Sequence, residues 1–154
     1  MSVALASSTE QPARRRAGRS SPKTFLALVD SALPDLAREV GRGLSPRLVD
    51  DAADFLRVSK AEIMAITEVK PASLSRWSRE GQPLPMGESD RLARVARVTC
   101  LARQLLGSAE DAVQWLNTPV PALGNVRPLS LLTSDAGSRM VEDALARSAA
   151  GVLA

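Results

Sequence analysis

Histidine and tyrosine are absent from this sequence of 154 residues, and cysteine occurs once. Without histidine, the chain lacks the most common general base and the most common metal ligand of proteins. Its one thiol, Cys100, cannot form an intrachain disulfide or a cysteine-rich zinc site, and it favours a reducing, cytoplasmic environment. We therefore expect neither a metal nor a cofactor.

Long apolar runs and nucleotide-binding loops are absent too. No hydrophobic stretch approaches the length of a membrane span. The N-terminal basic residues are followed by Ser20-Ser21-Pro22-Lys23, whereas a secretion signal would continue into an apolar segment. Neither a glycine-rich phosphate loop nor a nucleophile elbow occurs. These absences predict a cytoplasmic protein with no membrane partner, which acts by binding and is not an enzyme.

Positive charge is concentrated near the N-terminus. Residues 1–23 carry five basic side chains against one acid, Glu10, whereas the remaining 131 residues carry 15 basic and 16 acidic side chains. The net charge of +3 is therefore no argument for nucleic-acid binding by the folded part. Residues 1–22 are rich in Ser, Ala, Arg and Pro without periodicity, which predicts a disordered basic tail. The alternative is an arm that contacts phosphates.

Apolar residues recur at steps of three and four from Thr24 onward, which predicts an all-α protein. Glycine, proline and capping residues mark the ends of its helices. The expected helices are 24–40 with a break before Pro34, 46–56, 60–68, 71–80, 87–106, 109–116 and 135 to about 151. The expected caps are Ser45 before Pro46, Ser59 with Glu62, Ser108 with Asp111, and Ser134 or Asp135. We expect a helix-turn-helix region over 23–84 and a helical C-terminal module over 85–154.

The stretch 59–81 has the pattern of a helix-turn-helix. Ile63, Val69, Leu74 and Trp77 fall where such a motif needs apolar residues. The second helix of this motif enters the major groove of DNA, where its outward side chains contact bases and phosphates. The candidate DNA-binding residues are Lys70, Ser73, Arg76 and Arg79.

Two features of this stretch depart from the usual motif. Glu68 occupies the turn position where glycine is common, because glycine tolerates a left-handed backbone, and we therefore expect a slightly different turn. Pro71 and Ala72 stand at the tip of the second helix, where they cannot read the hydrogen-bond pattern of a base pair. A plain three-helix cluster that does not bind DNA remains the alternative.

Three groups of residues resemble the Xre/MbcA/ParS antitoxins, the partners of RES-domain toxins. The resemblance covers roughly residues 43–151. Arg57-Val58-Ser59 through Leu74-Ser75-Arg76-Trp77 is similar to the degenerate helix-turn-helix of that family, and Glu88-Ser89-Asp90-Arg91-Leu92 is similar to the start of its long central helix. The third group is Ala112, Trp115-Leu116, Pro119, Leu123-Gly124, Pro128, Leu131-Leu132, Gly137, Val141, Leu145, Arg147 and Gly151. Asn125 and Ser130 depart from the family, which often has Gly and Asp there.

The resemblance implies how such a protein works. Its N-terminal half would bind the operator of its own operon, and its C-terminal half would cover the active-site cleft of a toxin that consumes NAD. It would form a homodimer or a higher assembly with the toxin and would perform no chemistry itself. The alternatives are a stand-alone helix-turn-helix regulator and an adaptor that does not bind DNA.

The candidate toxin-binding residues are Trp115, Pro119, Leu123, Leu131, Arg139 and Arg147. Trp115 is either a core residue or an interface anchor, and of Leu131 and Leu132 we expect one in the core and one at the surface. Proline restricts the backbone and thereby lowers the cost of ordering on binding. Arg139 and Arg147 are either solvated or face acidic groups or a phosphate pocket of the toxin.

Arginine also recurs along the long central helix, at positions 91, 94 and 97. Such a row is usually a solvated face, and we expect these side chains to pair with Glu88 or Asp90. A row that binds phosphates is the alternative.

Overall fold

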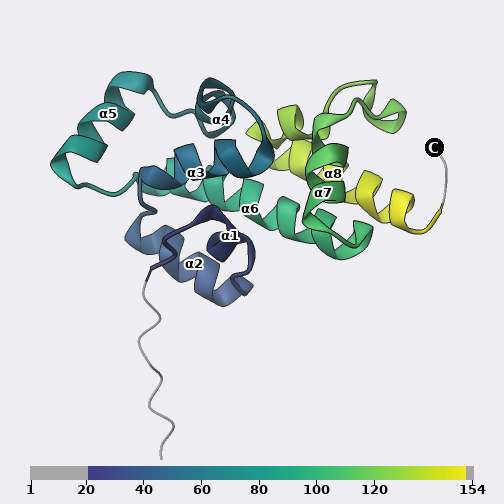
Figure 1. Cartoon of the computed structure of the whole chain (residues 1–154), viewed down its shortest axis with the longest axis horizontal. Coiled ribbons are helices and arrows are strands. Elements are labelled where there is room, and N and C mark those ends of the chain that lie inside the picture. Colours follow the sequence, from purple (N-terminus) through teal and green to yellow (C-terminus); the bar gives the residue numbers. More distant parts are fainter. Residues whose placement is uncertain (1–20, 152–154) are drawn as a thin grey trace, which may run out of the picture.

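The structure, a computed structural model, describes residues 21–151 (Figure 1). Within this range the regular elements are helices, and one isolated antiparallel bridge joins Val120 and Val126. The prediction of an all-α protein is thus confirmed. Residues 1–20 of the predicted basic tail lie outside the described range. None of the described helices is both long and apolar enough to cross a membrane.

The N-terminal half consists of short helices. They are α1 (Phe25–Val29), α2 (Leu33–Arg42), α3 (Arg47–Leu56), α4 (Lys60–Thr67) and α5 (Pro71–Glu80). The predicted break before Pro34 is confirmed, because α1 ends at Val29 and α2 begins at Leu33. Pro34 lies in the first turn of α2, where the missing N–H of proline has no helical partner to lose.

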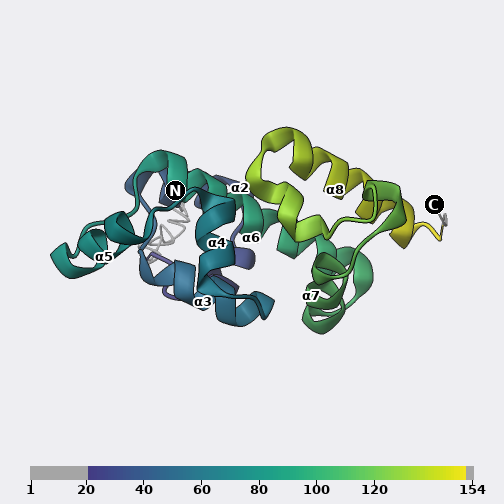
Figure 2. The ribbon, with the colours of Figure 1, turned by 90° about the horizontal axis from the view of Figure 1, so that it is seen from above.

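A long helix, α6 (Met86–Leu106), connects this half to the C-terminal half. The later elements are α7 (Ala109–Asn117), the 3-10 helices η1 (Pro121–Leu123) and η2 (Pro128–Thr133), and α8 (Asp135–Ala149). Helix α6 lies in the middle of the molecule (Figure 2). It contacts α1, α2 and α4 of the N-terminal half and α7, η2 and α8 of the C-terminal half. Its residues Leu92, Val95 and Val98 are fully buried. One core therefore extends through both halves.

Side-chain caps form at three of the four helix starts where the sequence predicted them. The side chains of Ser59, Ser108 and Ser134 each accept a hydrogen bond from the backbone three residues ahead, at 3.0–3.1 Å. The expected Ser45 cap is wrong. Pro46 itself precedes α3 with helical dihedral angles (φ −55°, ψ −28°), and no side chain caps that helix.

Ser89 joins two loops at the start of α6. Its hydroxyl accepts a hydrogen bond from the N–H of Leu44 (2.9 Å) and donates one to the carbonyl of Leu84 (3.1 Å). The N–H of Leu84 in turn donates to the carbonyl of Leu44 (2.8 Å). A β-carbon on Gly43, whose φ is +85°, would lie 2.7 Å from the carbonyl oxygen of Leu84. The serine of the Glu-Ser-Asp-Arg-Leu run therefore holds together the two backbone segments that cross here.

The arginine row of α6 pairs mostly with other elements. The pairs are Arg91 with Glu68 (2.8 Å), Arg94 with Asp90 (3.6 Å) and Arg97 with Glu142. The expected pairing within α6 is correct for Arg94 alone among the three. The other two guanidinium groups connect α6 to the end of α4 and to α8, because those elements pack beside it.

Candidate functional site

The turn between α4 and α5 has an ordinary left-handed geometry. Glu68 has φ +57° and ψ +30°, and the N–H of Val69 donates to the carbonyl of Met64 (2.9 Å). The expectation of a different turn is therefore wrong: Glu68 takes the conformation that glycine would take. A non-glycine residue in this region costs about 1 kcal/mol, and the carboxylate of Glu68 pairs with Arg91 at 2.8 Å.

Helix α5 lies at one end of the molecule, set apart from the other helices (Figures 1 and 2). Its inward side is held by Leu74, which is 3% exposed, and by the half-buried Trp77, as predicted. Spacing of three and four along a helix defines a single face. The outward face of α5, defined here as Ala72, Ser75, Arg76 and Arg79, is exposed to solvent throughout.

The four predicted DNA-binding residues are not equivalent in the structure. Arg76 and Arg79 lie on the outward face of α5, and Lys70 is exposed at its N-cap. Ser73 is half-buried at the edge of the inward side. Ser75 was not among the predicted residues, although its spacing from Arg79 and Ala72 would have placed it on the outward face.

Two of the predicted toxin-binding residues pack wholly or partly in the core of the C-terminal module. Leu123 is 6% exposed and packs in the core, so it offers almost no side-chain surface to a partner. Trp115 is half-buried and packs against the same core. Of the two adjacent leucines, Leu132 is buried and Leu131 is half-buried, in line with the expectation of one core residue. Pro119 is exposed just after α7.

Gly137 sets the position of α8 against η2. A β-carbon at this glycine would lie 1.9 Å from the carbonyl oxygen of Leu131. Any larger residue would push the two elements apart, because a backbone carbonyl cannot move aside alone. Glycine at this position therefore allows α8 to lie against η2 at backbone contact distance.

The outward face of α8, defined here as Arg139, Met140, Asp143 and Arg147, is exposed. Met140 is 49% exposed, which leaves an apolar side chain between two cations. The Nε of Arg139 lies 3.0 Å from a carboxylate oxygen of Asp135, and this hydrogen bond lowers the pKa of Asp135, with smaller contributions from the charges of Arg139, Arg94 and Arg97. The face thus presents two guanidinium groups and one apolar side chain on a helix.

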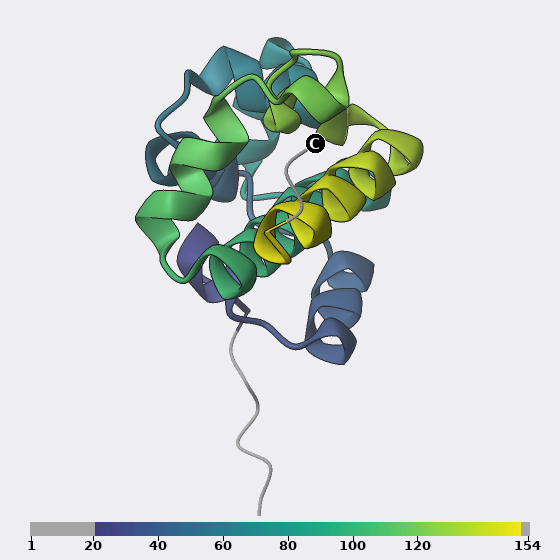
Figure 3. The ribbon, with the colours of Figure 1, turned by 90° about the vertical axis from the view of Figure 1, so that its right-hand side faces the viewer.

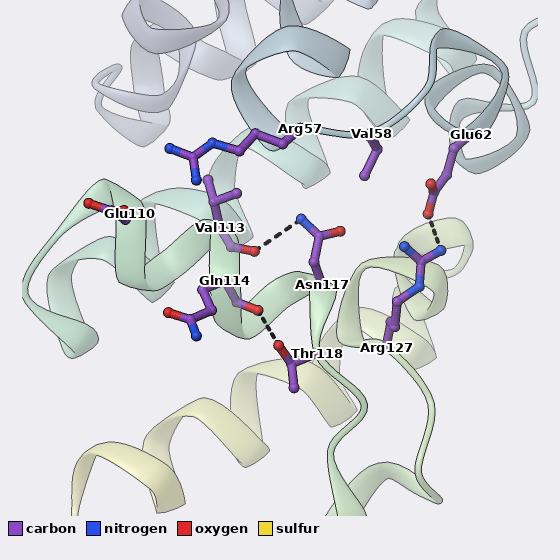
Figure 4. A pocket seen from close by; sticks show the side chains of 9 residues that line it. All are labelled: Arg57, Val58, Glu62, Glu110, Val113, Gln114, Asn117, Thr118 and Arg127. Carbon is purple, nitrogen blue, oxygen red and sulfur yellow. Dashed lines mark hydrogen bonds and ion pairs between the residues drawn. The ribbon is translucent and has the colours of Figure 1, made fainter.

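A polar cleft of about 580 Å³ marks the junction of the two halves (Figure 4). The side chain of Asn117 on α7 donates hydrogen bonds to the carbonyls of Leu56 (2.8 Å) and Val113 (3.1 Å). Across the cleft, Arg127 pairs with Glu62 in the first turn of α4. These contacts join the helix-turn-helix to the C-terminal module. In residues 21–151, no group of three or more His, Cys, Asp or Glu side chains is placed to hold a metal ion.

Two known domain families match consecutive parts of the chain. Residues 35–97 match the Antitoxin Xre-like helix-turn-helix domain, and residues 101–151 match the Antitoxin Xre/MbcA/ParS C-terminal toxin-binding domain. Together with the all-helical fold, these matches define a helix-turn-helix antitoxin of a toxin–antitoxin system. The interval between the two matched ranges falls inside α6, the helix that both halves share.

Relatives extend the similarity over most of the chain. Antitoxin Xre of Pseudomonas putida is 33% identical over 132 residues, which are 81% of this chain and 80% of the relative. Antitoxin Xre of Yersinia enterocolitica is 32% identical over 118 residues, covering 76% and 80%. A Prs ADP-ribosylating antitoxin of Sphingobium is 26% identical over 165 aligned residues, covering 96% and 99%. The chain belongs to the Xre family of antitoxins.

Proposed function

We propose that this antitoxin neutralises a RES-domain toxin that consumes NAD, and that it represses its own operon through α5. The observation that carries this proposal is the separation of two exposed helical faces, on α5 and on α8, by one continuous core (Figure 1). The resemblance to partners of RES-domain toxins supports the identity of the toxin. A relative bears the name of an ADP-ribosylating antitoxin, and ADP-ribosyl transfer consumes NAD.

The proposed toxin contact uses shape and charge and needs no catalysis by the antitoxin. Arg139 and Arg147 project from the outward face of α8, and guanidinium groups make strong bidentate hydrogen bonds with carboxylates. Pro119 is exposed and Trp115 and Leu131 are half-buried, so these residues leave apolar surface on the same C-terminal module. Since the helix is already ordered by its packing on α6 and η2, binding has a small entropic cost. Operator DNA and a toxin that acts on NAD would both be met in the cytoplasm, and we propose this location for the protein.

The proposal predicts a RES-domain toxin gene beside the gene of this chain, and neutralisation is tested by co-expression with that toxin. The intact antitoxin is expected to restore growth, and the double variant Arg139→Glu/Arg147→Glu to weaken toxin binding at least tenfold, or by about 1.4 kcal/mol. Arg47→Glu, an exposed arginine at the start of α3, is the matched control with unchanged affinity. Failure of the intact chain to restore growth or to co-purify with the toxin would reject neutralisation. Full binding by the double variant would reject only the assignment of these two arginines.

Operator binding is proposed to place the outward face of α5 in the major groove, with two copies of the chain on two half-sites. Arg76→Ala is expected to weaken binding to the chain's own promoter by about 1–3 kcal/mol, and Lys70→Ala to reduce the salt dependence by about one phosphate contact. Fluorescence anisotropy at several salt concentrations measures both, with Arg38→Ala on α2 as the control. The mass of the free chain in solution tests the dimer. If the intact protein does not bind this DNA, an adaptor is favoured. If it binds the DNA but forms no complex with a toxin, a stand-alone regulator is favoured.

A further inference from the structure

A groove of about 370 Å³ crosses α6 between α2 and the start of α8. We call it the α2–α8 groove, and its lining includes Leu33, Leu36, Ala37, Val40, Arg94 and Asp135. In Figure 3, which views the molecule from its C-terminal end, α2 (blue) lies below α8 (yellow). The lining residues come from α2, α6 and the first turn of α8, so these three helices share one concave surface.

The wall formed by α2 is apolar and partly open. Leu33, Leu36, Ala37 and Val40 follow the spacing of one helical face. Leu36 is buried on α6, whereas Leu33 is 64% exposed and Ala37 is also exposed. The apolar face of α2 is thus wider than the strip that α6 covers. An exposed apolar strip beside a groove is typical of a surface that another chain covers.

The opposite wall is charged and belongs to α6 and α8. Arg94 pairs with Asp90 within α6, and Asp135 pairs with Arg139. Asp135 lines the groove, while Arg139 lies on the outward face of α8. The groove is therefore continuous with the surface assigned above to the toxin. It also carries both signs of charge, which suits an amphipathic protein segment better than the uniformly negative backbone of DNA.

We propose that the toxin bound by the C-terminal module also occupies the α2–α8 groove, an inference that rests on the function proposed above. A toxin segment with apolar residues toward Leu33 and residues of both charges toward Arg94 and Asp135 fits the two walls. Two observations favour the toxin over a second copy of the chain: the groove continues into the face of α8, and α8 lies within the toxin-binding domain. Toxin binding would then involve α2, a helix of the N-terminal half.

The experiment compares two leucines that undergo the same substitution. Leu33→Asp places an acid in the first turn of α2, where the helix dipole favours it, so the fold is retained. Leu26→Asp on α1, where the leucine is 44% exposed and outside the groove lining, is the matched control. Ala37→Arg, at an exposed helical position, adds bulk within the groove as a second test. Calorimetry with the purified toxin encoded beside this chain measures affinity, and melting temperature and mass in solution are measured for each variant.

Leu33→Asp and Ala37→Arg are expected to raise the Kd for the toxin at least tenfold, with unchanged melting temperature and unchanged affinity for DNA. Leu26→Asp is expected to bind like the intact chain. Unchanged toxin affinity in both groove variants overturns the inference and leaves neutralisation standing. If toxin affinity is unchanged but Leu33→Asp lowers the mass of the free chain, the groove belongs to a second copy, which also overturns it. If the intact chain does not bind the toxin, the proposed function fails first.

Discussion

At the scale of single residues, glycine has opposite roles at two helical positions. Gly137 lies where a β-carbon would meet the carbonyl oxygen of Leu131 at 1.9 Å, whereas a β-carbon on Gly41, near the end of α2, would meet nothing within 4 Å. The first glycine is required by a backbone crossing. The second is not required, because alanine would fit the same helical backbone. Glycine there only increases the conformational entropy that the chain loses on folding.

Gly137→Ala is therefore expected to lower the free energy of unfolding by about 3 kcal/mol, because α8 must move away from η2. Gly41→Ala, the matched control, is expected to raise it by about 0.5–1 kcal/mol. Urea unfolding followed by circular dichroism measures both values. Equal effects of the two substitutions would contradict the close approach of α8 and η2.

Two fully buried serines provide a second comparison. The hydroxyl of Ser89 makes hydrogen bonds with the backbone of Leu44 and Leu84, whereas the hydroxyl of Ser138 has no hydrogen-bond partner among the described residues. Loss of the Ser89 hydroxyl would leave a buried N–H and a buried carbonyl with one fewer partner. A buried hydroxyl without a partner costs free energy in the folded state.

Ser89→Ala is accordingly expected to lower the free energy of unfolding by about 2 kcal/mol, whereas Ser138→Ala is expected to be neutral or to raise it by up to about 1 kcal/mol. Chemical unfolding of the two variants beside the intact chain gives these differences. A destabilising effect of Ser138→Ala as large as that of Ser89→Ala would refute the distinction.

At the scale of elements, α5 and α6 differ most in how extensively they pack against the rest of the protein. The long helix α6 packs against helices of both halves, whereas α5 is anchored inward by Leu74 and the half-buried Trp77. Local opening is easiest where few apolar contacts are buried. The helix proposed to contact DNA is thus the one least restrained by the rest of the fold.

Amide hydrogen exchange is expected to be faster in α5 than in the buried stretch of α6 around Val95 and Val98, which should exchange only through global unfolding. Mass spectrometry of peptides from each helix measures the difference. Addition of promoter DNA is expected to slow exchange in α5, and addition of toxin to slow it in α8. Protection of α5 equal to that of α6 in the free chain would contradict the loose anchoring.

At the scale of the whole molecule, the helix-turn-helix and the toxin-binding module share one core. Helix α6 passes through both, and the Arg127–Glu62 pair and the Asn117 side chain join α4 and α3 to the later elements. The chain has two tryptophans, Trp77 in the N-terminal half and Trp115 in the C-terminal half. Each therefore reports on one half.

Unfolding is expected to occur in one cooperative transition. In Trp115→Phe the fluorescence comes from Trp77, and in Trp77→Phe it comes from Trp115. In each variant, the fluorescence midpoint should coincide with the midpoint by circular dichroism, because neither half can lose α6 without exposing the core of the other. A fluorescence transition that precedes loss of helix in either variant would show that the halves unfold separately.

Local features were predictable because they depend on residues within one or two helical turns. The apolar spacing placed most helices, and three serine caps formed as their three-residue spacing predicted. The inward positions of Leu74 and Trp77 followed from the same periodicity. The Ser45 cap failed because Pro46 already has a helical backbone, which no spacing rule detects.

The sequence by itself thus determined the helical class, most helix boundaries and the resemblance that led to the antitoxin family. Only the tertiary structure decided that Glu68 takes a left-handed turn, that Arg97 and Arg127 pair with residues 45 and 65 positions away, and that α2 forms a groove with α8. The reason is physical. Helix formation depends on neighbours along the chain, whereas ion pairs between elements and shared surfaces depend on how the helices pack, which short spacing patterns do not encode.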